Sequence, residues 1–287
     1  MKPDVKTFFD EETFTASHVV CDQSEGTCAI IDSVLDYDAA AGRTSTSSAD
    51  AIIDYVRSND MAVEWILETH VHADHLTAAP YLKEKLGGKS GIGDQVRVIQ
   101  DTFGKIFNVE AEFSTHGSHF DTLFADGEAF KVGGIEAKFI YTPGHTPACS
   151  TIVIGDAAFV GDTLFMPDYG TARCDFPGGD ARTLYRSIQR IFALPDETRL
   201  FMCHDYKAPG RDTFKWQTTV AEQRSKNIHI HGGVSEDEFV AMRESRDKNL
   251  SMPKLILPSV QVNMRGGAMP PPEDNGVSYL KIPINTL

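Results

Sequence analysis

The pattern of apolar and polar positions divides the chain into short strands and amphipathic helices. Near the N-terminus, after position 120 and again close to position 200, short apolar runs are bounded by glycine and polar turn residues, which is typical of strands. Elsewhere, apolar residues three and four positions apart indicate helices with one buried side. We predict strands at 14–21, 27–31, 63–69, 129–132, 135–141, 150–154, 158–160 and 199–203.

Helices are predicted between these strands. Ile52, Ile53 and Val56 have the spacing of a buried helix face, and Ser47 or Ser48 is the expected N-cap of that helix. The segment 33–48 before it is expected to be a long connection. Two strand-rich stretches that each lead to helices predict an α/β fold of two sheets packed face to face with helices outside. Predicted helices cover about 48–59, 77–86, 92–107, 181–192, 220–227 and 235–249, and a proline run at 270–272 introduces a tail.

The composition is that of an ordinary globular protein, with 41% hydrophobic and 24% charged residues among 287. We predict a domain at 1–250, followed by a C-terminal extension at 251–287 that packs on or near the active-site domain. The net charge of −14 repels phosphate backbones, so nucleic acid is not an expected partner. An anionic small substrate would need local arginines.

Cysteine usage and the lack of long apolar runs predict a cytoplasmic protein. The five cysteines are scattered, odd in number and form no C-x-x-C pair, which argues for a reducing compartment and against a disulfide framework or a thiolate zinc site. No apolar core of signal-peptide length and no run of about 18 apolar residues is found, so neither secretion nor membrane insertion is expected. The sequence does not decide between a monomer and a homodimer.

The segment from Thr69 to His75 carries the strongest chemical signal in the chain. It reads Thr-His-Val-His-Ala-Asp-His and places three of the ten histidines and one aspartate within six residues. It follows a predicted strand and precedes a predicted helix, and a loop in that position can direct several side chains into one pocket. Imidazole with carboxylate is a donor set that transition metals prefer, so this loop is a candidate metal site.

Three further candidate ligands follow predicted strands. His145 lies in the turn Thr-Pro-Gly-His-Thr-Pro, Asp162 in Gly-Asp-Thr-Leu, and His204 in His-Asp-Tyr. Loops at strand ends converge above a sheet, where active sites are assembled. A lone histidine in such a place is more often structural, but together with the histidine loop these residues favour a metal centre.

The order of these residues resembles the metallo-β-lactamase superfamily. The resemblance covers roughly residues 14–206 and implies an αβ/βα four-layer sandwich with metal at one edge of the paired sheets. It does not fix the chemistry, because the superfamily contains hydrolases, nucleases and oxidoreductases. The residues that carry it are His70, His72, Asp74, His75, His145, Asp162 and His204.

Finer motifs resemble the persulfide dioxygenases, a glyoxalase II-like branch of this superfamily. This resemblance implies one Fe(II) per chain, held by His70, His145 and Asp162, and oxidation of glutathione persulfide by O₂ to sulfite and glutathione. Two histidines and one carboxylate are also the ligand set of non-haem iron oxygenases, which leave coordination positions open for reactants. The motifs are T-H-x-H-A-D-H, T-P-G-H-T-P, G-D-x-L, Arg173-Cys174-Asp175-Phe176 where the branch has R-T-D-F, His204-Asp205-Tyr206 and Asn263-Met264-Arg265.

A dinuclear zinc hydrolase of glyoxalase II type is the alternative. In such enzymes one metal would take His70, His72 and His145, the other would take Asp74, His75 and His204, and Asp162 would bridge the two. All seven residues are present, so the ligand set alone leaves both readings open. In the dioxygenase, His72, Asp74, His75 and His204 would instead orient the ligands and tune the iron.

Candidate residues for substrate and catalysis come from the same motifs. Arg173 and Arg265 are candidates to hold the glutathione carboxylates, because a guanidinium grips a carboxylate with two parallel hydrogen bonds. Tyr206 and Asp74 are candidate catalytic residues beside the metal. Asp175 is expected to order its own loop, and Cys174 to pack in the interior. His116 and His119 are expected in an exposed loop and His18 in a strand, and His229 and His231 are weak candidates for metal binding.

Overall fold

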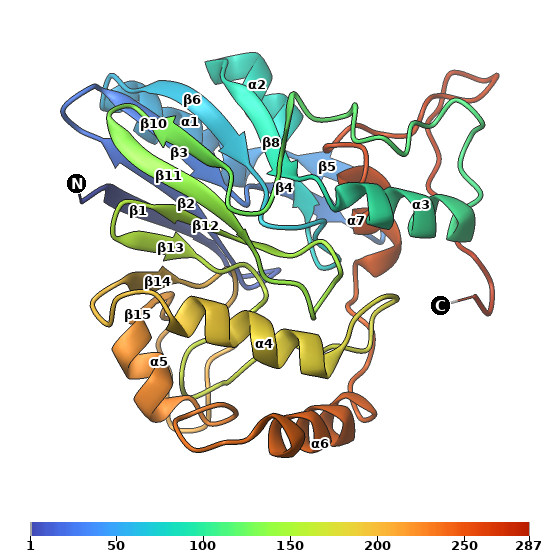
Figure 1. The fold of residues 1–287 in the computed structure, drawn as a ribbon. Coiled ribbons are helices and arrows are strands. Elements are labelled where there is room, and N and C mark those ends of the chain that lie inside the picture. Colours follow the sequence, from blue (N-terminus) through green and yellow to red (C-terminus); the bar gives the residue numbers. More distant parts are fainter. Residues whose placement is uncertain (1, 287) are drawn as a thin grey trace.

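The computed structural model of the chain describes residues 2–286 and contains two six-stranded sheets (Figure 1). The first has the strand order β1-β2-β3-β6-β8-β9, with β1 (Asp4–Asp10), β2 (Thr15–Asp22), β3 (Thr27–Ile31), β6 (Ala62–Leu67), β8 (Lys89–Gly93) and β9 (Thr122–Phe124). The second runs from β10 to β15 in chain order, with β10 (Ala129–Val132), β11 (Ile135–Tyr141), β12 (Ser150–Ile154), β13 (Ala157–Phe159), β14 (Arg199–Phe201) and β15 (Gln217–Thr219).

Helices cover the outer faces of both sheets, which confirms the expected αβ/βα sandwich (Figure 1). On the side of the first sheet lie α1 (Ser47–Ser58) and α2 (Ala79–Leu86). On the side of the second lie α4 (Ala181–Phe192), α5 (Val220–Lys226) and α6 (Glu236–Asp247). At one end, α3 (Val96–Ile106) shares an apolar cluster with α7 (Ile256–Asn263).

The central strands β12 and β13 of the second sheet are buried on both faces. Ile152 and Ile154 of β12 join the apolar cluster between the sheets, whereas Val153 between them packs under α4. This alternation follows from the two-residue period of a strand. Phe139 of β11 and Phe124 of β9 stack across the interface with ring centroids 4.3 Å apart, so aromatic packing joins the two sheets.

The structure corrects several predicted elements. The segment 33–48 is not a plain connection, because β4 (Val34–Asp38) pairs with β5 (Arg43–Ser45) and with β7 (Leu76–Thr77) in a third, small sheet. The helix predicted from position 92 begins only at Val96, since β8 occupies 89–93. Four further elements were not predicted, namely β1, β9, β15 and α7.

The predicted N-cap of α1 is also wrong. Ser47 is already the first helical residue, and the hydroxyl of Ser48 donates to Asp36 of β4 at 2.5 Å. The N-cap is Thr46, whose hydroxyl donates to Asp50 at 2.8 Å instead of closing the helix end. The contact with β4 could not be foreseen while this strand was read as a loop.

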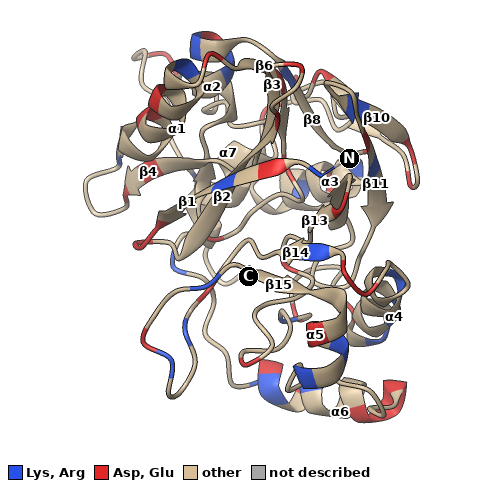
Figure 2. Ribbon diagram, turned by 90° about the vertical axis from the view of Figure 1, so that its left-hand side faces the viewer, with Lys and Arg blue, Asp and Glu red and all other residues tan. Residues whose placement is uncertain are grey.

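Charged residues are mixed over the surface. Basic and acidic positions lie next to one another on α2, α5 and α6 (Figure 2). In the described part of the chain, no helix combines the length and apolar character needed to cross a bilayer. The predicted division at residue 250 stays a prediction, although α7 contacts β7 directly beside the histidine loop.

Truncation of Phe139 should destabilise the protein strongly. Its side chain is fully buried and stacks on Phe124, so Phe139→Ala leaves a cavity between the sheets. We expect a loss of about 3–5 kcal/mol in the free energy of unfolding. Urea denaturation checks this, with Val98→Ala on the exposed side of α3 as the control that should lie within about 0.5 kcal/mol of the parent.

Candidate metal centre

The predicted ligands converge at one edge of the sandwich, on loops that follow β6, β11, β13 and β14. The histidine loop and the second sheet are joined there by a hydrogen bond from Ser150 N–H to the Thr69 carbonyl, 3.0 Å long. Gly161 adopts a φ of 51°, and a Cβ on it would lie 2.6 Å from the Thr69 hydroxyl. Only glycine therefore lets the Asp162 loop approach so closely.

His70, His145 and Asp162 form a first group of donors. One donor atom of each lies within 4.8 Å of the others, and all three residues are buried. Nε2 of His145 is 3.7 Å from Oδ2 of Asp162. The structure thus brings together the two histidines and the carboxylate predicted as iron ligands.

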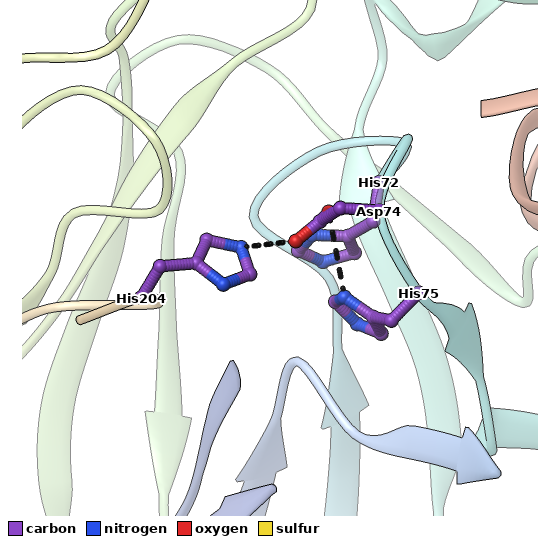
Figure 3. Close-up of side chains that lie close together, drawn as sticks. All are labelled: His72, Asp74, His75 and His204. Carbon is purple, nitrogen blue, oxygen red and sulfur yellow. Dashed lines mark ion pairs between the residues drawn. The ribbon is translucent and has the colours of Figure 1, made fainter. Parts of the chain in front are cut away.

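His72, Asp74, His75 and His204 form a second group, also with donor atoms within 4.8 Å of one another (Figure 3). Nε2 of His204 lies 3.0 Å from Oδ2 of Asp74 and 3.4 Å from Oδ1 of Asp162. Asp162 therefore faces the first group with one oxygen and the second group with the other, which is the position of a bridging ligand.

The donor atoms have the property expected of metal ligands: they are buried and lack protein partners. Although His204 and Asp74 approach to 3.0 Å, their facing atoms are not aligned as a hydrogen bond. A buried polar atom without a partner costs about 1–3 kcal/mol, and a bound cation would remove that penalty. The atoms are Nε2 of His70, Nδ1 of His72, Oδ2 of Asp74, Nε2 of His75, Oδ1 of Asp162 and Nε2 of His204. The residues therefore fit a metal centre.

The other nitrogen of each imidazole is held from outside the centre. Such outer hydrogen bonds fix the tautomer and the orientation of ligating histidines. His145 and His204 donate from Nδ1 to the carbonyl oxygens of Arg173 and Phe14, at 2.8 and 3.2 Å. The remaining contacts are His70 Nδ1 to the Thr69 hydroxyl at 3.1 Å, His72 Nε2 to Asp32 at 3.0 Å and His75 Nδ1 to the Thr15 hydroxyl at 3.4 Å.

Asp32 is a residue of the site that the sequence analysis missed. This buried carboxylate accepts from the Thr69 N–H at 2.8 Å, the Thr69 hydroxyl at 2.9 Å and His72 Nε2 at 3.0 Å. Its φ of 52° is rare for a residue other than glycine, and such strain concentrates at functional sites. One signal in the sequence could have identified Asp32, because it directly follows a predicted strand. Asp162 and His204 also lie shortly after strands and were identified in that way.

Electrostatics set the protonation of the metal-free histidines. Burial lowers the pKa of His70 and of His75. Burial also opposes charge on His72 and His204, but nearby carboxylates prevail: Asp32 and Glu68 raise the pKa of His72 well above its ordinary value, and Asp74 and Asp162 raise that of His204 to about 9. His70 and His75 are therefore neutral, with lone pairs available for a metal.

A cavity of about 570 Å³ opens onto the centre, with Asp74, His145 and Asp162 in its wall. Tyr206 lines it and stacks on His204, with ring centroids 5.8 Å apart. Burial, with Asp74 and Asp162 nearby, raises the pKa of Tyr206 well above its usual value, so the phenol stays protonated. Both predicted catalytic residues thus border the cavity.

The two predicted substrate arginines lie differently. Arg173 lines the cavity, but its guanidinium donates to Asp175 at 2.6 and 2.7 Å and to the Ser251 carbonyl at 2.6 Å. Arg265 is not among the cavity residues; it forms a bidentate ion pair with Glu110, at 2.5 and 2.8 Å. Their role in substrate binding stays a prediction.

The weaker candidates lie outside both donor groups. Cys174 is buried in an apolar cluster, and Asp175 orders its own loop through Arg173. Within residues 2–286, none of the five remaining histidines belongs to a group of potential metal donors. His116 and His231 are exposed, His18 and His229 are buried and hydrogen-bonded, and His119 stacks on Phe113.

An αβ/βα sandwich with a buried histidine and aspartate cluster at one edge, open to a cavity, defines a metal-dependent enzyme. The sequence profile of the metallo-beta-lactamase superfamily matches residues 11–204, and the chain belongs to this superfamily.

Relatives support this family and its persulfide dioxygenase branch. A probable metallo-hydrolase of Burkholderia pseudomallei is 56% identical, with 99% of each chain covered. The mitochondrial persulfide dioxygenase ETHE1 of Bos taurus is 29% identical over 93% of this chain and 90% of its own. The crystal structure of ETHE1 from Myxococcus xanthus superposes with a TM-score of 0.73 and 29% identity, covering 92% of this chain and 100% of the other. The chain spans 65% of a longer relative, a beta-lactamase hydrolase-like protein of Agrobacterium fabrum.

Removing the negative charge of Asp32 should weaken metal binding. Asp32→Asn loses the carboxylate that orients His72, and losses of such outer partners typically lower metal affinity about 10–100-fold. Competition with a chromophoric chelator measures this affinity. Asp38→Asn, an exposed aspartate on β4, is the control and should bind metal like the parent. Equal affinity in the two variants would show that Asp32 does not orient His72.

Proposed function

We propose that the protein is a persulfide dioxygenase with one Fe(II) per chain, which converts glutathione persulfide, O₂ and water to glutathione and sulfite. The observation that carries this proposal is the first donor group, in which two imidazoles and one carboxylate lie together at the end of a cavity. This set leaves coordination positions free for reactants, and Fe(II) bound there supplies the chemistry that lets O₂ react with sulfur. The similarity to named persulfide dioxygenases supports the same reaction.

The protein's own residues would exclude water and orient the persulfide. Three aromatic side chains line the cavity, those of Phe165, Tyr169 and Phe176. They would limit the water that reaches the sulfur of the persulfide. The protonated hydroxyl of Tyr206 can donate a hydrogen bond to a reactant. Although burial opposes its ionisation, His204 holds the pKa of Asp74 well below its usual range, so the carboxylate stays ionised and can accept a hydrogen bond from the water that the reaction consumes.

Two further cations suit the carboxylates of glutathione. Arg246 at the end of α6 and Lys254 after it both line the cavity. Neither side chain has an ion-pair or hydrogen-bond partner among residues 2–286, whereas the donors of Arg173 are occupied. Arg246 and Lys254 are therefore available to an anionic ligand, in a protein whose net charge of −14 gives no long-range attraction.

A dinuclear zinc hydrolase acting on thioesters is the second candidate. The observation that favours it is the second donor group, which is complete and shares Asp162 with the first. The name of the relative from Burkholderia pseudomallei, a probable metallo-hydrolase, points the same way. Metal analysis of the purified protein together with oxygen uptake tests the two: near one iron per chain with uptake supports the dioxygenase, and near two zinc ions without uptake contradicts it.

Variants of the second group distinguish the candidates at the level of single residues. In a dioxygenase, His75→Ala and His204→Ala should keep most of their iron and lose about 10–100-fold in oxygen uptake, because these residues only orient the ligands. His145→Ala, the control from the first group, should lose iron and activity together. Metal content per chain is the measurement. Loss of one metal equivalent from each second-group variant would instead establish a dinuclear centre.

Neutralising the free cations should weaken substrate binding without changing the metal. Arg246→Gln and Lys254→Gln should each raise the Michaelis constant about 3- to 10-fold and leave turnover nearly unchanged, because a carboxylate remote from sulfur is held alike in ground and transition states. The effect should shrink with added salt, since both residues are exposed. Lys248→Gln on the same helix end, outside the cavity, is the matched control. Unchanged Michaelis constants in both cavity variants would place the carboxylates elsewhere.

A further inference from the structure

We propose that the buried ion pair between Arg243 and Asp247 on α6 positions the metal ligand His145 by clamping the loop 171–175. The inference rests on the metal centre alone and holds for either candidate reaction. The proposal gives α6 a role at the metal centre, although Arg243 lies about forty positions after His204, the last predicted ligand.

The link between this loop and the ligand is one hydrogen bond. Nδ1–H of His145 donates to the carbonyl oxygen of Arg173 at 2.8 Å. The opposite nitrogen, Nε2, faces Asp162 at 3.7 Å. Because an imidazole is rigid, the position of the Arg173 carbonyl sets the direction in which Nε2 points.

The clamp holds the backbone on both sides of Arg173. Arg243 donates from Nη1 to the Thr171 carbonyl at 2.9 Å, and Asp247 accepts from the Cys174 N–H at 2.8 Å. Nδ1 of His229 accepts from the Thr171 N–H at 3.0 Å and adds a third fixed point. The peptide that carries the Arg173 carbonyl therefore lies between anchored residues.

The ion pair itself is closed to solvent. Arg243 donates from Nε and Nη2 to one oxygen of Asp247, at 3.0 and 2.7 Å, and the two residues are 1% and 5% exposed. Desolvation offsets most of the attraction in such a pair, and apolar replacements of similar volume are often neutral or stabilising. Stability alone therefore does not account for the pair, whereas the fixed loop does.

The rival explanation is that the pair merely docks α6. The chain offers a control for this, because Arg182 on α4 pairs with Glu236 and Asp237 at the start of the same helix, at 2.9 and 2.8 Å. This ion pair is exposed and does not contact the loop 171–175.

The experiment compares Arg243→Met/Asp247→Leu with Arg182→Met/Glu236→Gln by titrating the metal-free proteins with Co(II). Both should remain folded, with melting temperatures near that of the parent. We expect the buried double variant to bind Co(II) about 10–100-fold more weakly and to show a changed visible absorption spectrum, and the exposed variant to match the parent in both. Unchanged affinity and spectrum in the folded buried variant would overturn the proposal.

A second arm tests whether the effect passes through His145. In a His145→Ala background, whose residual Co(II) affinity is measured with Co(II) in large excess, the same double substitution should cause no further loss, because the positioned ligand is already gone. An undiminished further loss would overturn the proposal in favour of general docking. Should the double variant fail to fold, Arg243→Lys replaces it, since a lysine keeps the charge but cannot hold Asp247 and the Thr171 carbonyl in one fork. Parent-like Co(II) binding by that variant would count equally against the clamp.

Discussion

The rest of the structure depends on one constraint, which is that several donor atoms point into a buried space where no protein group bonds them. Six such atoms of imidazole and carboxylate groups carry a desolvation penalty that a bound cation would remove. Left to themselves, these side chains would turn toward one another or toward solvent. They are prevented from doing so because each imidazole is tied at its other nitrogen to a carbonyl, hydroxyl or carboxylate outside the centre. The positive φ of Asp32 is part of the same arrangement, since it brings the carboxylate under both Thr69 and His72.

The outer contacts come from segments that are far apart in the sequence. The backbone of the histidine loop is held by Asp32 after β3, by Ser150 at the start of β12 and by Asn263 of α7. The Asn263 amide donates to the carbonyl oxygens of His72 and His75, at 2.9 and 2.7 Å. The C-terminal segment therefore holds the backbone of the loop that carries four of the candidate ligands. Assembly of the centre requires both sheets and this segment to be folded together.

The sequence predicted the cluster of donor residues better than the residues that support it. His70 to His75, His145, Asp162 and His204 could be found because spacing and strand ends mark them within local segments. Four strands of the second sheet, β10 to β13, were also predicted within one residue of their bounds, because short apolar runs between turn residues mark them, whereas β15 was missed. The pairing of β4 with β7 was missed because it depends on contacts about forty residues apart, and short polar strands have little signal of their own. The partner of Arg265 is Glu110, a residue in a distant segment, and no local pattern connects the two.

The number of metals is not determined by the ligand set, because protons compete with a metal for the second group. The carboxylates of buried Asp32 and Asp162 and of half-buried Asp74 surround this space, and their charge must be balanced by nearby positive charge. Burial raises the pKa of Glu68, a fourth carboxyl group beside His72. In the metal-free protein, the raised pKa values of His72 and His204 let imidazolium protons supply part of it. A cation in the first group, beside neutral His70, leaves those protons in place, whereas a cation in the second group must displace them. Two arrangements can therefore balance the carboxylate charge. One has a single iron and a protonated second donor group, and the other has two zinc ions and a deprotonated second donor group. More alkaline conditions favour the arrangement with two zinc ions.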